Sequence, residues 1–250
     1  MKKTTGLALV FSCWIFLTAQ SVAAPLRIVT LEQPPIQYEE QGVIKGIAVD
    51  IVKEVFARMQ QPITLKIYPF VRTLHMLKTG QADAIFAIVK KPERELFLSY
   101  PHEILIEQTG SLFVRRDSPI QFGGDFRKLS PYTFGILRGA TYGPLYDKAV
   151  KNGTISKIED VDDYEKNVLK LINNRVDILV GPRLTMLAAI KELGRKEDVK
   201  ELSPPIQVVP TYLAFAKQGI APEIQTKFEQ ILQELKRDGT YDRIIQAYTH

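Results

Sequence analysis

Cysteine is nearly absent from this chain. The only one among the 250 residues is Cys13, and the three histidines, His75, His102 and His250, are far apart. This excludes a disulfide framework, and the spacing matches no known metal motif. No Gly-x-Ser-x-Gly sequence and no phosphate-binding glycine loop occurs. The sequence therefore predicts no cofactor, no metal site and no nucleophilic catalysis.

Strong charge of one sign is also lacking. The chain has 33 basic and 28 acidic residues, a net charge of +5, and removal of Lys2 and Lys3 with an N-terminal leader leaves 31 − 28 = +3. Basic residues are scattered and are not interleaved with aromatic ones, so nucleic acid is not an expected partner. Apolar residues at 45% and charged residues at 24% are typical of a globular protein.

The N-terminus has the three parts of a secretory signal peptide. Lys2 and Lys3 precede an apolar run from Leu7 to Leu17, and the small residues Ser21 and Ala23 follow it. We expect residues 1–23 to be removed by cleavage after Ala23. The alternative is a membrane anchor, but a run of about 11 residues is much shorter than the roughly 20 needed to span a bilayer.

A lipid anchor on Cys13 is the second alternative. It fits poorly, because Phe11 stands where a small residue is expected and the cut would divide the apolar run. We therefore expect an exported protein without a membrane tether, which is retained in the periplasm.

The chain after the signal peptide alternates strands and amphipathic helices. We expect strands at 26–30, 63–68 and 84–89, a helix that begins near Asp50, and a helix from Phe70 that Gly80 ends. The continuous apolar run 84–89 is typical of a strand that is buried on both faces. These elements predict a parallel sheet that helices cover.

A second α/β unit follows. We expect strands at 132–137 and 176–180 and helices from Thr141 and over 164–173. Long extended segments at 104–115 and 206–217 bracket this unit, and helices near 224–235 and up to Tyr248 follow it. Two lobes joined by two crossing strands have a cleft between them, which is where small ligands bind.

Several short motifs resemble those of a known family. Asp83-Ala84-Ile85, Pro92-Glu93-Arg94 and Phe97-Leu98-Ser99-Tyr100-Pro101 resemble the signature of bacterial extracellular solute-binding proteins of family three. Pro34-Pro35-Ile36 with Gly46 and Asp50 resembles its opening motif, and residues 238–242 resemble its closing helix. The motifs occur in order over residues 26–248.

This resemblance implies a type II periplasmic binding fold, an α/β architecture of two lobes with two hinge strands and a ligand cleft between the lobes. Lobe 1 is expected to be discontinuous, comprising residues 24–114 and 207–250, and lobe 2 to comprise residues 115–206.

The resemblance also implies a carboxylate site. In amino-acid-binding relatives an arginine that corresponds to Arg94 clamps the ligand carboxylate, and a planar guanidinium suits this task. The second contact maps to the turn Gly139-Ala140-Thr141, where amides and a hydroxyl at a helix start can hold an anion. The alternatives are a surface arginine that pairs with Glu93 or Glu95, and an ordinary Thr N-cap.

The chain departs from the family at the ammonium site. Pro182 stands where relatives carry an aspartate for the ligand ammonium, and the usual polar stretch after the third strand is replaced by Ala87-Ile88-Val89-Lys90. An unpaired ammonium in a closed cleft is costly. We therefore expect either a ligand without that ammonium or substitution of the aspartate by Glu32.

Aromatic residues are expected to form the cleft walls. Tyr38, Tyr68 and Phe70 lie at strand ends or loops that face the cleft in this fold, although core packing is the competing explanation for Phe70. Arg72 and Arg183 are further candidate cationic contacts, and Ile88 is a candidate apolar contact.

These observations predict a binding protein and no enzyme. We expect a monomer that closes on a small polar ligand with a carboxylate group, such as an amino acid or a related organic acid, and delivers it to an ABC permease. Two alternatives remain: a ligand-sensing partner of a membrane sensor, and a dehydratase of the cyclohexadienyl type, for which Glu32 and Glu165 are the candidate acids.

Overall fold

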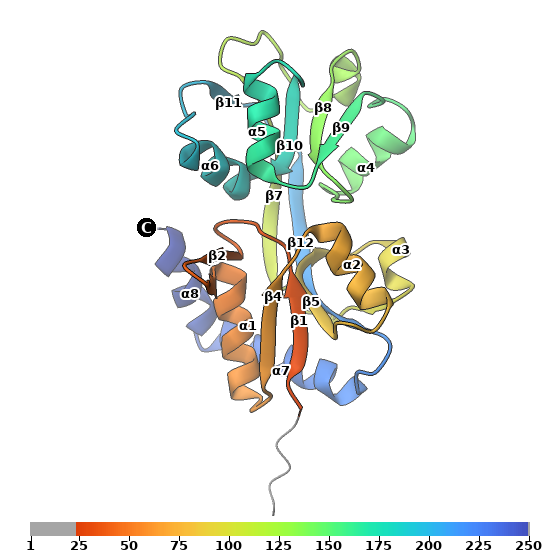
Figure 1. Ribbon diagram of the computed structural model, residues 1–250, viewed down its shortest axis with the longest axis vertical. Helices are drawn as coiled ribbons and strands as arrows, with labels where there is room; N and C mark the ends of the chain where they lie inside the picture. Colours follow the sequence, from red (N-terminus) through yellow and green to blue (C-terminus); the bar gives the residue numbers. More distant parts are fainter. Residues whose placement is uncertain (1–23, 250) are drawn as a thin grey trace, which may run out of the picture.

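The computed structural model describes residues 24–249, so the expected signal peptide and Cys13 lie outside the described part of the chain. Two lobes lie one above the other, and two long strands connect them (Figure 1). Both lobes belong to one curled sheet with the strand order β4-β1-β5-β12-β7-β10-β8-β9. The expected two-lobed α/β architecture is confirmed.

Lobe 1 contains a parallel sheet between two helical layers. Its central strands are β4 (Ile63–Ile67), β1 (Leu26–Thr30) and β5 (Ala84–Val89). Its helices are α1 (Ile47–Arg58), α2 (Phe70–Lys78), α3 (Pro92–Glu95), α7 (Pro222–Arg237) and α8 (Thr240–Thr249). The short strands β2 (Tyr38–Glu40) and β3 (Val43–Lys45) form a hairpin, and β6 (Leu98–Ser99) pairs with β12.

Strand β5 explains why this sheet needs helices on both sides. Ala84 and Phe86 pack in the cluster that contains α1 and α7, whereas Ile85 packs in the cluster that contains α2. Successive side chains of a strand point to opposite faces, so an uninterrupted apolar strand is stable only when both faces are covered. The prediction from the apolar run at 84–89 is confirmed.

Lobe 2 repeats this architecture. Its strands are β8 (Phe134–Leu137), β9 (Ile158–Val161), β10 (Ile178–Pro182) and β11 (Val199–Glu201), and β8 pairs in parallel with both β9 and β10. Helices α5 (Tyr164–Ile172) and α6 (Arg183–Glu192) pack in one apolar cluster, and α4 (Pro144–Lys151) packs in another. The 3₁₀ turn η1 (Phe126–Leu129) precedes β8.

The two connections between the lobes are antiparallel neighbours. Strand β7 (Ile106–Arg115) pairs with β12 (Gln207–Ala216) between 106–110 and 207–211. From Gly110 onward β7 pairs with β10 of lobe 2, and from Thr211 onward β12 pairs with β5 of lobe 1. The expected lobe boundaries, after residue 114 and before residue 207, lie in these two strands and stay predictions.

Helix α1 begins at Ile47. The start expected from the sequence was near Asp50, three residues later. The amides of Ile47 and Ala48 donate to the carbonyls of Pro35 and Ile36, at 3.1 and 2.9 Å. Gly46 precedes them at φ 126°, and a Cβ there would lie 2.6 Å from the Ile36 oxygen. No side chain fits so close to the backbone, so this position requires glycine.

Within the described part of the chain, no helix has both the length and the apolar character needed to cross a membrane.

Candidate functional site

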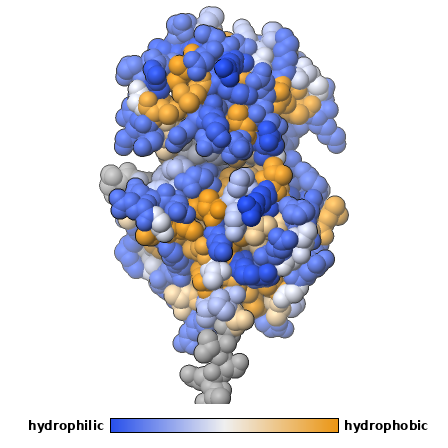
Figure 2. Space-filling model, viewed as in Figure 1, coloured by the Kyte–Doolittle hydropathy of each residue, from blue (hydrophilic) through white to orange (hydrophobic). Residues whose placement is uncertain are grey.

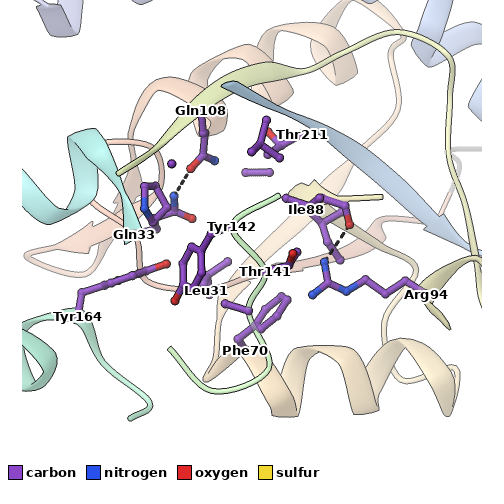
Figure 3. Close-up of a pocket in the computed structure, with 16 residues that line it drawn as sticks. Leu31, Gln33, Phe70, Ile88, Arg94, Gln108, Thr141, Tyr142, Tyr164 and Thr211 are labelled. Atoms are coloured by element: carbon purple, nitrogen blue, oxygen red, sulfur yellow. Dashed lines mark hydrogen bonds between the residues drawn. The ribbon is translucent and has the colours of Figure 1, made fainter. Parts of the chain in front are cut away.

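The lobes enclose a cavity of about 60 Å³ next to the hinge strands, which we call the inner cavity (Figure 3). Arg94, Phe70 and Ile88 line it from lobe 1, and Ala140 and Thr141 line it from lobe 2. The cavity holds only a few water-sized groups, since one water needs about 10–15 Å³. The inner cavity therefore has room only for a small group between the lobes.

Arg94 is the buried cation of the inner cavity. It lies on α3, one short turn after β5, and only 5% of its surface is exposed. Its guanidinium donates to the carbonyl of Val89 in lobe 1 at 2.8 Å and to the carbonyl of Gly139 in lobe 2 at 3.1 Å. It also lies 5.1 Å from the centre of the Phe70 ring.

No carboxylate within residues 24–249 pairs with this guanidinium. Lys91 and Lys90 pair instead with Glu93 and Glu95, the two glutamates beside Arg94. Burial lowers the pKa of Arg94, because the charged form is deprived of water. The alternative of a surface arginine is wrong. The cavity contains a buried positive charge that carbonyl groups and a ring contact directly, while Glu93 and Asp147 favour it from a distance without pairing with it.

The turn that follows β8 forms the opposite wall. Gly139 adopts φ 72°, and the amide of Ala140 donates to the carbonyl of Leu137 at 3.1 Å. The Thr141 hydroxyl donates to Asp147 Oδ2 at 2.6 Å. Within the described residues, the Thr141 amide donates no hydrogen bond and remains available to an anion.

Thr141 does not cap a helix. Helix α4 begins at Pro144, and its N-cap is Gly143. The first amides of this helix do not face a free anion site, because Pro144 has no N–H and the Leu145 amide donates to Gln207 at 2.8 Å. The expected helix start at Thr141 and the N-cap alternative are both wrong, whereas Ala140 and Thr141 line the cavity.

A family model matches residues 26–250 of this chain, and it describes bacterial extracellular solute-binding proteins, family 3. The chain belongs to this family. One similar curated protein is the arginine-binding periplasmic protein of Mannheimia haemolytica, which is 25% identical over 99% of this chain and 98% of its own length.

Solved structures show the type II periplasmic binding fold. An ancestral arginine-binding protein bound to arginine has a TM-score of 0.79 at 22% identity, covering 92% of this chain and 100% of its own. A histidine kinase sensor domain with similarity to periplasmic binding proteins has a TM-score of 0.81 at 16% identity, covering 91% and 97%. The substrate-binding protein of an amino acid ABC transporter has a TM-score of 0.75 at 21% identity, covering 90% and 99%.

Five residues with polar side chains in the inner cavity of this family 3 protein were missed by sequence reasoning. Gln33 donates to Gln108 of β7 at 2.6 Å, and Thr211 of β12 donates to the Ile106 carbonyl at 2.7 Å. The others are Tyr142 and Tyr164 of lobe 2. Thr211 stands among mostly apolar residues of β12, which is a local signal that could have indicated it. Gln108 has no such signal, because its neighbours Glu107 and Thr109 are polar too.

Three of the expected ligand contacts line a different space. Glu32, Tyr38 and Tyr68 line a cavity of about 590 Å³, which we call the outer cavity. It shares the wall residues Phe70 and Tyr164, together with Leu31, with the inner cavity. Burial raises the pKa of Glu32, the Glu39 amide opposes this rise, and neighbouring carboxylates add to it.

The two remaining cationic candidates line neither the inner nor the outer cavity. Arg72 is exposed and stacks on the Tyr68 ring, with 4.5 Å between its Cζ and the ring centre. Arg183 is bound by Glu201 at 2.9 Å. Pro182 does line the inner cavity, so the wall at this position has no side-chain acceptor for an ammonium group.

No group of three His, Cys, Asp or Glu side chains in residues 24–249 is arranged to hold a metal ion.

Proposed function

We propose that this protein is a periplasmic solute-binding protein whose lobes close on a small carboxylate-bearing ligand, either an amino acid or a related organic acid. The observation that carries the proposal is the buried Arg94 guanidinium, which has no carboxylate partner in the described chain. Its two bonds to carbonyls use two of the five N–H donors of a guanidinium. The remaining donors suit a bidentate carboxylate.

Closure follows from the position of the groups. Arg94 belongs to lobe 1 and the Thr141 turn to lobe 2, so a ligand touches both only when the cleft is shut. A buried charge without a counter-charge is unfavourable, and a ligand carboxylate relieves this cost. Binding energy is thereby spent on closing the hinge strands β7 and β12.

Delivery to an ABC permease is the output that we propose. The similar protein from Mannheimia haemolytica is named as an arginine-binding periplasmic protein, and one neighbour in fold is the substrate-binding protein of an amino acid ABC transporter. These names support amino-acid binding and transport. The sensor domain supports a shared fold only.

The positions of the two candidate acids, Glu32 and Glu165, also agree with a binding role without catalysis. Glu32 and Glu165 line the outer cavity and not the inner cavity beside Arg94. A general acid must lie within hydrogen-bond reach of the group that it protonates. A carboxylate held by Arg94 therefore has neither glutamate beside it in the inner cavity.

The test is titration calorimetry with a panel of amino acids and organic acids on the wild type and on Arg94→Met. We expect the variant to lose about 1.5–3 kcal/mol of binding free energy, or roughly 10- to 150-fold in affinity. Arg183→Met is the matched control, because it removes a guanidinium that is exposed and bound by Glu201. Equal affinity in Arg94→Met and wild type would contradict the proposal.

A further inference from the structure

The outer cavity is where a ligand must extend if its carboxylate occupies the inner one. The inner cavity of about 60 Å³ is filled by a carboxylate-sized group, whereas the outer cavity measures about 590 Å³. Leu31, Phe70 and Tyr164 line both cavities. The remainder of the ligand therefore lies against the walls of the outer cavity.

Those walls are strongly acidic although the chain is basic. Seven residues that line the outer cavity are acidic and one, Lys166, is basic, while the whole chain has a net charge of +5. Lys166 pairs with Asp162, and Lys45 pairs with Glu40. Five acidic residues have no ion pair within residues 24–249: Glu32, Glu39, Asp163, Glu165 and Glu192.

The acidic groups come from both lobes and repel one another across the cleft. Glu32 follows β1 of lobe 1, whereas Asp163 and Glu165 lie at the start of α5 in lobe 2. Burial is the main reason that the pKa values of Glu32 and Glu165 are raised, and the charge of Asp163 raises both further. Closure therefore brings like charges together, and a cation between them removes this cost.

Tyr164 points to a ligand independently of the carboxylates. Only 8% of its surface is exposed, and its hydroxyl makes no hydrogen bond to any residue in the described chain. The side chain lies in the wall between the two cavities, and its hydroxyl end is directed into the pocket (Figure 3). Burial also raises its pKa, so the phenol stays neutral and can donate or accept. The hydroxyl oxygen itself is not fully buried, because it opens on the cavity, so a ligand there can supply its hydrogen bond.

The molecule narrows at the waist where the lobes meet, and both hydrophilic and hydrophobic side chains border it (Figure 2). The outer cavity lies between the lobes, since Glu32 lines it from lobe 1 and Asp163 and Glu165 line it from lobe 2. A field of one sign at such an opening attracts ligands of the opposite sign.

We propose that the outer cavity binds a positively charged group of the ligand, so that the ligand carries a carboxylate at one end and a cation at the other. This inference rests on the proposed function, because Arg94 holds the carboxylate end. Glu32 and Glu165 hold the cation from opposite lobes, and the Tyr164 hydroxyl contacts the ligand between the two ends.

The experiment compares carboxylates that differ in distal charge and little in shape. Titration calorimetry is run with arginine against citrulline and with lysine against norleucine, and glutamate and succinate represent anionic ligands. We expect the cationic member of at least one pair to bind at least about tenfold more tightly than its neutral partner. Glu32→Gln combined with Glu165→Gln removes this preference, and Glu223→Gln, at the exposed start of α7, retains it.

Each result separates this inference from the proposed function. If neutral and cationic members bind equally, or if only glutamate, succinate or neutral acids bind, the outer cavity is not a cation site. The same conclusion follows if the double variant keeps the full preference. If Arg94→Met leaves every affinity unchanged, the proposed function itself fails, whatever the charge preference.

Discussion

An ion pair between Lys91 and Asp147 connects the two lobes near Arg94, and its removal should favour the open protein. Lys91 Nζ of lobe 1 lies 3.1 Å from Asp147 Oδ2 on α4 of lobe 2, and the two side chains are 25% and 30% exposed. Asp147 also accepts the hydrogen bond from Thr141 at 2.6 Å. This carboxylate therefore links the lobe contact to the wall of the inner cavity.

The size of the effect follows from this exposure. A partly exposed ion pair contributes about 0.2–1 kcal/mol, which corresponds to a change of roughly 1.4- to 5-fold in the ratio of closed to open protein. Lys91→Met removes the pair directly. Because ligand binds the closed form, its affinity should fall in proportion to the closed fraction, and therefore by at most the same factor.

Distance measurements between labels on the two lobes, without ligand, provide the assay. Lys91→Met should shift the wild-type distribution toward longer distances. Lys90→Met is the matched control, because Lys90 pairs at 3.1 Å with Glu95 of the same lobe. If both variants behave alike, or if neither changes the distribution, the pair does not control closure.

Two further predictions concern the framework and the ligand. Burial alone would raise the pKa of Asp83, but hydrogen bonds and the charge of Arg27 outweigh it and lower the pKa. The stability that the lowered pKa of Asp83 gives is present at neutral pH, and it is lost as the pH falls below the usual aspartate pKa of about 4. Asp83→Asn should therefore lower the free energy of unfolding, measured with urea, at pH 7 and much less at pH 3. The inner cavity wall has no acceptor at Pro182, so 5-guanidinovalerate, which is arginine without its α-ammonium, should lose less than about tenfold in affinity by calorimetry. A larger loss would mean that another group binds the ammonium.

The central strands of both lobes were predictable from local apolar patterns, and the position of Arg94 from the resemblance to the family motif, whereas β9 and β11 were not predicted. The apolar run of β5 permits only a doubly covered strand, and the position of Arg94 directly after it follows from the family motif. Helix α6 was missed for a physical reason. Leu184 and Leu187 on α6 face solvent, at 43% and 36% exposure, so the apolar residues do not mark one buried face.

The start of α4 shows how one signal can hide another. The Gly143-Pro144 pair marks the true N-terminus, since proline is favoured at the first helical position, but the nearby Thr141 suggested an earlier cap. The sequence also placed Glu32 near the ligand without showing that it and Arg94 line different cavities. That separation depends on how the lobes approach one another, which no local pattern encodes.

The crystal structure of the complex with the tightest-binding carboxylate tests the central claim most directly. We predict a carboxylate oxygen about 2.7–2.9 Å from a guanidinium nitrogen of Arg94, in a cleft closed by the Thr141 turn. A ligand whose carboxylate lies away from Arg94, while the guanidinium donates only to the carbonyls of Val89 and Gly139 as it does here, would contradict it.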